Sequence, residues 1–163
     1  MIVIVMGVSG SGKTTIGEKL AARLGWRFIE GDDYHPPENV AKMAAGTPLS
    51  DEDRWPWLER LNAVLRGEED AVVTCSALKE SYRRRLTQGI AEHRLVYLHG
   101  SRELIGARVA ARKHRYMPAS LLDSQFATLE PPANAIAVDV AGNAEDSVAA
   151  ILERLRANLT GRR

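Results

Sequence analysis

Eight residues near the start of the chain have the types and spacing of a loop that binds phosphate groups. A glycine is followed by four residues, a second glycine, a lysine and a hydroxyl residue: Gly7, Val8, Ser9, Gly10, Ser11, Gly12, Lys13 and Thr14. Backbone N–H groups of such a loop converge on phosphate oxygens, and the positive end of the next helix points at them. We predict a nucleotide-binding segment that extends through Thr15, with Lys13 at the β- and γ-phosphates and the Thr14 hydroxyl on Mg²⁺. The alternative, a glycine turn with a surface lysine, is disfavoured by the apolar run before the segment and the amphipathic pattern after it.

A second group of reactive side chains follows the apolar pair Phe28–Ile29. Asp32, Asp33 and His35 come directly after it, at the edge of a parallel sheet where ligands bind. A carboxylate there can take the proton of an attacking hydroxyl beside the γ-phosphate, and Asp32 is the better-placed candidate. Asp33 either shares this role or caps the following segment. His35 taken alone is typical of a packed turn, and only its neighbours make it a site candidate.

Cations further along the chain suit anionic groups. The planar fork of Arg54 matches a carboxylate, although a surface ion pair is the alternative. A basic cluster before Pro118 is typical of a lid, at about residues 112–120, that closes over phosphates. Its members are Arg108, Arg112, Lys113, His114 and Arg115. An exposed basic face is the alternative interpretation of this cluster.

The sequence lacks the motifs that identify other classes of nucleotide-binding protein. The sequence contains no guanine-reading Asn/Thr-Lys-x-Asp segment, which GTPase switches need. The third apolar run ends in Thr74, Cys75 and Ser76, where ATP-driven motors carry an acidic pair. Small-molecule kinases therefore remain.

The elements that position these residues alternate along the chain. Short apolar runs predict strands at Ile2–Met6, Phe28–Ile29, Ala71–Cys75, Leu95–Leu98 and Ala135–Val140. Helical patterns fall between them, one from Ile16 to a stop at Gly25, then Ser50–Arg66, Ser101–Arg112 and a last helix capped by Asn143. Such alternation predicts an α/β fold, a parallel sheet with helices on both faces.

Composition fits an ordinary single domain spanning 1–163. The 163 residues carry 22 Lys+Arg against 21 Asp+Glu, a net charge of +1, which argues against nucleic-acid binding by bulk charge. The single cysteine, Cys75, excludes an internal disulfide and fits a reducing compartment. No apolar run approaches the ~18–20 residues of a membrane span. We therefore expect a cytoplasmic protein without a nucleic-acid or membrane partner.

Beyond the phosphate loop, three stretches of the sequence resemble one particular family of kinases. They are 31–58, then Cys75-Ser76-Ala77-Leu78-Lys79 with Tyr82-Arg83-Arg84, and Ser124-Gln125-Phe126 with Thr128-Leu129-Glu130-Pro131. In them the chain resembles gluconate kinases (gluconokinases), small P-loop kinases related to shikimate and adenylate kinases, from Ile2 to about Leu155. The resemblance implies a five-stranded parallel sheet with a small lid, a homodimer, and ATP-dependent, Mg²⁺-assisted phosphorylation of D-gluconate at its 6-hydroxyl.

The resemblance also extends the set of site candidates. Those for the acceptor are Asp32, His35, Lys42, Arg54, Lys79, Arg83 and Gln125; those for catalysis are Asp32, Lys13 and Arg112. Without the resemblance, Lys79 is a first-turn helix lysine, Arg83 part of a solvated helix face and Gln125 a helix-surface amide. The lid departs from the family, which usually reads Gly-His-Phe where this chain has His114, Arg115 and Tyr116.

Two other functions stay open at this point. One is the same chemistry on another small acidic acceptor. The other is a nucleotide-dependent regulatory or binding protein that has lost catalytic turnover. This second function is disfavoured because the residues that catalysis needs are intact: Lys13, Thr14, Asp32 and Arg54.

Overall fold

Five parallel strands form the centre of the molecule. The computed structural model describes residues 1–111 and 118–160. The strands are β1 (Ile2–Met6), β2 (Arg27–Glu30), β3 (Ala71–Thr74), β4 (His93–His99) and β5 (Ile136–Asp139). They lie in the order β2-β3-β1-β4-β5, and each neighbouring pair is parallel. The predicted five-stranded parallel sheet is confirmed. Arg112, His114 and Arg115 of the predicted lid lie outside the described residues.

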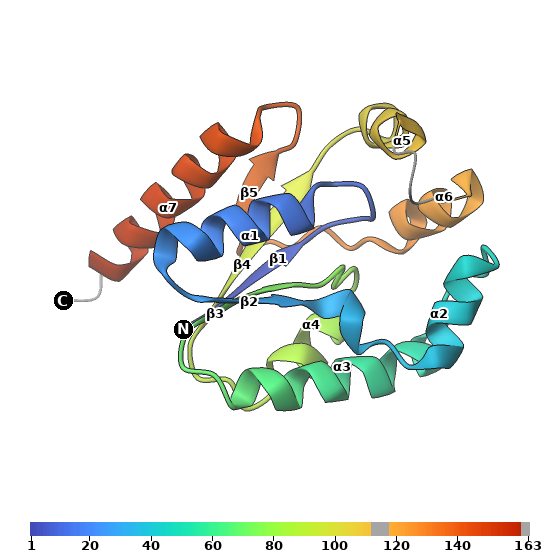
Figure 1. Cartoon of the computed structure of the whole chain (residues 1–163), viewed down its shortest axis with the longest axis horizontal. Coiled ribbons are helices and arrows are strands. Elements are labelled where there is room, and N and C mark those ends of the chain that lie inside the picture. The colour runs from blue at the N-terminus through green and yellow to red at the C-terminus, as the bar shows by residue number, and fades with distance from the viewer. Residues whose placement is uncertain (112–117, 161–163) are drawn as a thin grey trace.

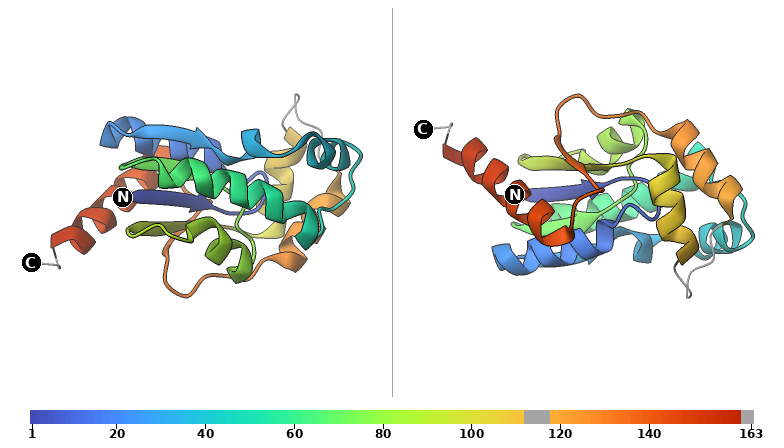
Figure 2. Two further views of the ribbon diagram at one scale, coloured as in Figure 1. Left: turned by 90° about the horizontal axis from the view of Figure 1, so that it is seen from below. Right: turned by 90° about the horizontal axis from the view of Figure 1, so that it is seen from above.

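Helices cover both faces of this sheet. They are α1 (Lys13–Leu24), the 3₁₀ turn η1 (Gly31–Tyr34), α2 (Pro37–Ala44), α3 (Asp51–Arg66), α4 (Glu80–Thr87), α5 (Arg102–Ala111), α6 (Ala119–Thr128) and α7 (Ala144–Thr160). Figure 1 shows α1 and α7 on one face and α3 and α4 on the other. The views of Figure 2 place α2, α5 and α6 together at the end where the strands terminate. This end therefore carries the loops that can hold ligands.

The central strand is buried on both faces because each face packs against helices. All five residues of β1 are at most 2% exposed, which explains why its sequence is a continuous apolar run rather than an alternating one. On α3 the buried stripe is Leu58, Leu61 and Leu65, as the four- and three-residue spacing predicts. Each such leucine contributes roughly 1.5–3 kcal/mol of hydrophobic stabilisation. The sheet is thus a fixed base for the loops after its strands.

Local capping sets where α3 begins, close to the candidate site. The Asp53 N–H donates to Ser50 Oγ at 3.1 Å, and the Ser50 N–H donates to Asp53 Oδ2 at 2.9 Å. This is a reciprocal capping box, and it begins the helix where the pattern over Ser50–Arg66 predicts. The predicted stop of α1 is confirmed, since Gly25 ends that helix with a φ of 72°. The predicted cap at the start of α7 is confirmed as well, since Asn143 Oδ1 accepts from the Asp146 N–H.

Two short elements after β2 have no sequence signature. Neither η1 nor α2 is predicted by hydrophobic periodicity, because α2 buries only Asn39 while Val40 is 52% exposed.

Strand β4 also begins earlier than its apolar run, since His93 pairs with Ile2 of β1. Among the described residues, no helix is both long and apolar enough to cross a bilayer.

Candidate active site

The loop between β1 and α1 has the backbone shape that phosphate binding needs. Gly10 and Gly12 adopt φ values of 82° and 92°, in the left-handed region that favours glycine. A Cβ at Gly10 would overlap the Val109 side chain, so the loop also packs too closely against α5 for any larger residue. Gly12 caps α1, and the helix N-terminus therefore opens directly onto the loop.

Lys13 folds back across this loop. Its ammonium group donates to the carbonyl oxygens of Gly7 and Val8, each at 3.0 Å. Beneath it, Ser11 Oγ is buried and has no hydrogen-bond partner within the described part of the chain. A cation, a helix N-terminus and an unpaired buried hydroxyl together make a cradle that suits phosphate oxygens.

A hydroxyl and a carboxylate meet beside the cradle. Thr14 Oγ1 donates to Glu30 Oε2 at 2.7 Å, and Thr74 Oγ1 donates to Glu30 Oε1 at 2.6 Å. Oxygen ligands of this kind suit Mg²⁺. Within residues 1–111 and 118–160, no group of three or more His, Cys, Asp or Glu side chains could hold a metal alone. A metal here would need phosphate oxygens to complete its shell. The sequence analysis missed Glu30. The pattern that could have identified it is an acidic residue at the last position of a strand, here β2.

A small pocket of about 50 Å³ adjoins the cradle. Seven segments contribute to its wall: the phosphate loop with the start of α1, η1 with the residue that follows it, α2, the segment before α3, α3 itself, the loop after β3, and α6. The lining residues are Ser9, Lys13, Asp32, His35, Met43, Pro48, Leu49, Arg54, Trp57, Ser76, Leu78, Leu121, Ser124 and Gln125. The structure thus brings together six predicted site residues from four separate stretches of the sequence: Ser9 and Lys13, Asp32 and His35, Arg54, and Gln125.

The buried side chain of Arg54 forms part of the wall of this pocket. Its Nη1 donates to the Leu49 carbonyl at 2.6 Å and to the Tyr82 hydroxyl at 3.0 Å. The Tyr82 hydroxyl in turn donates to the Asp51 carboxylate. Burial and this hydrogen bond raise the pKa of Tyr82 to about 12, so it stays a neutral partner. The alternative of a surface ion pair is wrong, because Arg54 is only 9% exposed and pairs with no acid among the described residues.

Asp32 and His35 share one side of the turn η1. In a 3₁₀ turn, side chains three residues apart align, and His35 Nε2 lies 3.7 Å from Asp32 Oδ1. The Asp32 side chain is 55% exposed, whereas that of His35 is 3% exposed. Asp33 is exposed and does not line the pocket. The capping interpretation of Asp33 is wrong, since α2 begins at Pro37 and its N-cap residue is Pro36, without any side-chain cap.

Gln125 links the pocket to the phosphate loop. Its Oε1 accepts from the Ser9 N–H at 2.7 Å, and its Nε2 donates to Ser9 Oγ at 3.0 Å. Both ends of the amide therefore hold one residue of the loop, and Gln125 is not a surface amide of α6.

Known proteins resemble this chain over nearly its whole length. A family model described as an AAA domain matches residues 2–132. A probable gluconokinase from Xenopus tropicalis is 46% identical over 162 residues, covering 86% of this chain and 85% of the relative. The thermosensitive gluconokinase of Escherichia coli K12 is 50% identical over 133 residues, covering 79% and 71% of the two chains. The chain belongs to the gluconokinase family.

Solved structures agree with this membership. A gluconokinase from Sinorhizobium meliloti 1021 superposes with a TM-score of 0.90 at 46% identity, covering 98% of this chain and 95% of that one. A shikimate kinase from Aquifex aeolicus superposes with a TM-score of 0.61 at 20% identity, which shows a shared fold alone. The resemblance read from the sequence to gluconokinases is confirmed.

Three cations predicted to bind the acceptor of this gluconokinase-family chain lie outside the pocket lining. Lys42 pairs with Asp53 at 2.8 Å, and Lys79 pairs with Asp51 at 3.3 Å. Both acids belong to the first turn of α3. The third cation, Arg83, donates to carbonyls that include Ala77 at 2.8 Å. The structure thus uses all three to hold loops, and their part in acceptor binding stays a prediction.

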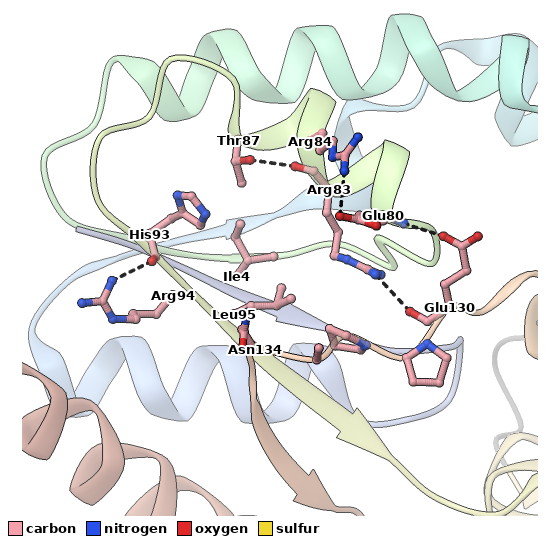
Figure 3. A pocket seen from close by; sticks show the side chains of 13 residues that line it. Ile4, Glu80, Arg83, Arg84, Thr87, His93, Arg94, Leu95, Glu130 and Asn134 are labelled. Atoms are coloured by element: carbon pink, nitrogen blue, oxygen red, sulfur yellow. Dashed lines mark hydrogen bonds and ion pairs between the residues drawn. The ribbon is translucent and has the colours of Figure 1, made fainter.

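Arg83 faces a different hollow, the groove of about 730 Å³ in Figure 3. The groove lies over β4, between α4 and the loop that follows α6, with Ile4 and Leu95 in its floor. Arg83 Nη2 crosses it to the Glu130 carbonyl at 3.0 Å. This bond ties the loop after α6 to α4, away from the phosphate cradle.

A further cavity, of about 280 Å³, adjoins the other side of the phosphate loop. Its wall includes Ser11, Thr15, Arg108, Gly142 and Asn143. The sequence analysis missed this cavity, because it interpreted Asn143 only as a helix cap and Arg108 only as a member of the basic cluster of the lid. The cavity is formed between α5 and the loop after β5, and no local pattern marks such a junction.

Proposed function

We propose that this chain transfers the γ-phosphoryl group of ATP to the 6-hydroxyl of D-gluconate, giving 6-phospho-D-gluconate and ADP. One observation carries the proposal: a carboxylate, Asp32, and a buried arginine, Arg54, line the same pocket as the phosphate-loop lysine. The first suits a hydroxyl that must lose a proton, and the second suits a substrate that bears a carboxylate. Family membership supports the same reaction.

The phosphate cradle accounts for the nucleotide side of the reaction. Residues 7–15 would surround the phosphates of ATP, and the cavity that contains Arg108 and Asn143 would receive the nucleoside. Mg²⁺, when bound, neutralises the charge that develops on the β- and γ-phosphate oxygens. Thr14 would hold it, since its hydroxyl lies at the helix N-terminus and donates its hydrogen bond to Glu30, which leaves the oxygen lone pairs for the metal. Arg112, in the segment about 112–120, would add a cation as a lid.

Arg54 accounts for the charge of the acceptor. Its Nη1 is used by Leu49 and Tyr82, while Nε and Nη2 donate to no residue in the described ranges. These groups are therefore available to the gluconate carboxylate. A buried guanidinium held by neutral partners keeps its full charge for the ligand, and a hydrogen bond to a charged group contributes about 1.5–3 kcal/mol. Gln125 and His35 would complete the contact surface.

Asp32 accounts for activation of the hydroxyl. A primary alcohol must lose its proton as the bond to phosphorus forms, and a nearby carboxylate can accept it. The transition state is loose, so correct placement of the hydroxyl matters as much as its deprotonation. Lys13, across the same pocket, would balance the charge on the transferred group.

The proposal extends to the setting of the enzyme. We infer a cytoplasmic homodimer whose only substrates are small molecules, without nucleic-acid or membrane partners. The near-neutral charge of +1 and the single buried cysteine support the cytoplasmic setting and the absence of a nucleic-acid partner, and the homodimer rests on the resemblance to gluconokinases.

The test is an ADP-release assay with purified protein, ATP and Mg²⁺ over a panel of sugar acids and sugars. We expect turnover with D-gluconate and little with neutral sugars, and 6-phosphogluconate as the product identified by mass spectrometry. Turnover with a different acid would move the proposal to that acceptor. Tight ATP binding without turnover on any member of the panel would contradict the proposed activity.

A further inference from the structure

A second layer of side chains lies behind the acceptor pocket and contains a buried asparagine. Asn39 is on α2, four residues after His35, and is 2% exposed. Its amide nitrogen is 2.8 Å from the Asp53 carbonyl oxygen and 3.1 Å from His35 Nδ1. It does not line the pocket, so it acts on the reaction only through the groups that it holds, the His35 ring and the Asp53 carbonyl.

The Asp53 carbonyl determines which end of the Asn39 amide faces this histidine. A carbonyl oxygen only accepts hydrogen bonds, so the amide atom beside it must be the nitrogen. That nitrogen carries two hydrogens, and the second is directed at His35 Nδ1. Nδ1 is therefore an acceptor, and a neutral His35 ring carries its proton on Nε2.

The His35 ring is also held in one plane and kept uncharged. It stacks on Trp57 with 4.0 Å between ring centroids, and the Trp57 indole N–H donates to the Gly31 carbonyl at 2.8 Å. Burial lowers the pKa of His35 to about 4, although the Asp32 carboxylate opposes this and the Arg54 cation adds to it. At neutral pH the ring is thus uncharged, and its protonated Nε2 lies 3.7 Å from Asp32 Oδ1, close enough for an electrostatic attraction although longer than a hydrogen bond.

We propose that Asn39 is a positioning residue for phosphoryl transfer, which fixes His35 as the Nε2–H tautomer and so orients the Asp32 carboxylate toward the acceptor hydroxyl. The inference rests on the proposed role of Asp32 as general base. A neutral N–H orients a carboxylate while leaving it basic, whereas an imidazolium would form an ion pair that lowers its basicity. The opposite tautomer would turn the lone pair of Nε2 against Oδ1.

The tautomer is measured directly by long-range ¹H–¹⁵N correlation spectroscopy of the full-length, ¹⁵N-labelled protein at pH 7. The chain has four histidines, and the variant His35→Gln assigns the signals of His35. We expect Nδ1 at the shift of an unprotonated ring nitrogen and Nε2 at that of a protonated one. In Asn39→Asp the new carboxylate accepts from Nδ1, so Nδ1 becomes protonated. An Nδ1–H tautomer or an imidazolium in the unsubstituted protein would overturn the proposal.

Kinetics separate positioning from folding. We expect Asn39→Asp and Asn39→Leu to lower kcat roughly tenfold, less than the roughly 10²–10⁴-fold contribution of a general base, with gluconate Kd nearly unchanged. Asn62→Leu is the matched control, because the buried Asn62 amide also donates twice, to the Leu86 and Gln88 carbonyls at 2.8 Å, but away from the pocket. It should lower the melting temperature and leave the tautomer and kcat unchanged.

The kinetics of the Asn39 and Asp32 variants test two separate claims. Unchanged kcat in folded Asn39 variants would overturn the positioning role, whatever the tautomer. Unchanged kcat in Asp32→Asn would instead overturn the general base of the proposed function, while the tautomer measurement would still decide whether Asn39 controls His35.

Discussion

The phosphate cradle and the acceptor pocket share one wall but are built in different ways. The cradle is local: one loop of consecutive residues supplies backbone groups, a helix N-terminus and Lys13. The pocket is assembled from side chains of seven separate segments. Neighbouring side chains hold some of them in place: Tyr82, outside the lining, holds Arg54, and Trp57, in the wall itself, stacks on His35. Binding phosphate needs little beyond a backbone shape, whereas recognising one acceptor needs rigid side chains and therefore a supporting layer.

The largest expected effect is on the acceptor side. Asp32→Asn keeps the size and one acceptor oxygen of the side chain but cannot take up a proton. We expect kcat to fall by about 10²–10⁴-fold while the gluconate Kd, measured by calorimetry, stays near its original value. Asp33→Asn is the matched control, because Asp33 is exposed and outside the pocket lining, and it should change neither rate nor stability. A dead Asp33→Asn with an active Asp32→Asn would move the base to the other carboxylate.

On the cradle side, Lys13→Ala should lower kcat by roughly 10²–10³-fold or more, the effect of losing one electrostatic contact to the transition state. The ammonium also donates to two loop carbonyls. We therefore expect a moderate loss of stability without nucleotide, on the order of 1–3 kcal/mol, seen as a lower melting temperature in calorimetry. A Lys13→Ala protein that retains most of its kcat would contradict the assignment of the loop.

The supporting layer should give the pocket its own pH dependence. His35 has a pKa of about 4 in the folded chain against 6.5 when unperturbed, chiefly through burial. The unfolded chain therefore binds the extra proton between these two values, and folding stability falls as pH drops from 6.5 toward 4. Urea unfolding should show a loss on the order of 2–3 kcal/mol across this window that is missing in His35→Gln. Parallel pH curves for the two proteins would contradict the burial of a neutral ring.

Gln125 joins the two regions, so its loss should affect both substrates slightly. Gln125→Leu removes two hydrogen bonds to Ser9, each contributing about 0.5–1.5 kcal/mol. We expect the KM values for ATP and for gluconate to rise together, by roughly two- to tenfold. Ser120→Ala, at an exposed position of the same helix, should leave both unchanged. A rise confined to gluconate would make Gln125 an acceptor contact only.

The two regions also differ in how far they can be predicted from sequence. The strands, the main helices, the Ser50 cap and the phosphate loop depend on local spacing, and the sequence predicts them well. The stacking of Trp57 on His35 is not predicted, because the two rings come from different segments of the chain. The short α2 escapes prediction because it buries a polar residue, Asn39, in place of an apolar stripe. Glu30 and the cavity beside Arg108 escape it because contacts between distant segments define them.

Recognition of the acceptor's charge by Arg54 is tested with a pair of substrates that differ only at one end. D-Glucitol carries a CH₂OH group where D-gluconate carries its carboxylate. We would measure kcat/KM for both with the unsubstituted protein and with Arg54→Lys, which keeps the charge and loses the fork. The structure predicts that the unsubstituted protein strongly prefers gluconate and that this preference falls by about tenfold or more in the variant. A decrease of this size matches the loss of about 1.5–3 kcal/mol from a charged hydrogen bond. The KM for ATP should stay nearly constant. An equal preference in both proteins would contradict this assignment and make Arg54 a purely structural residue.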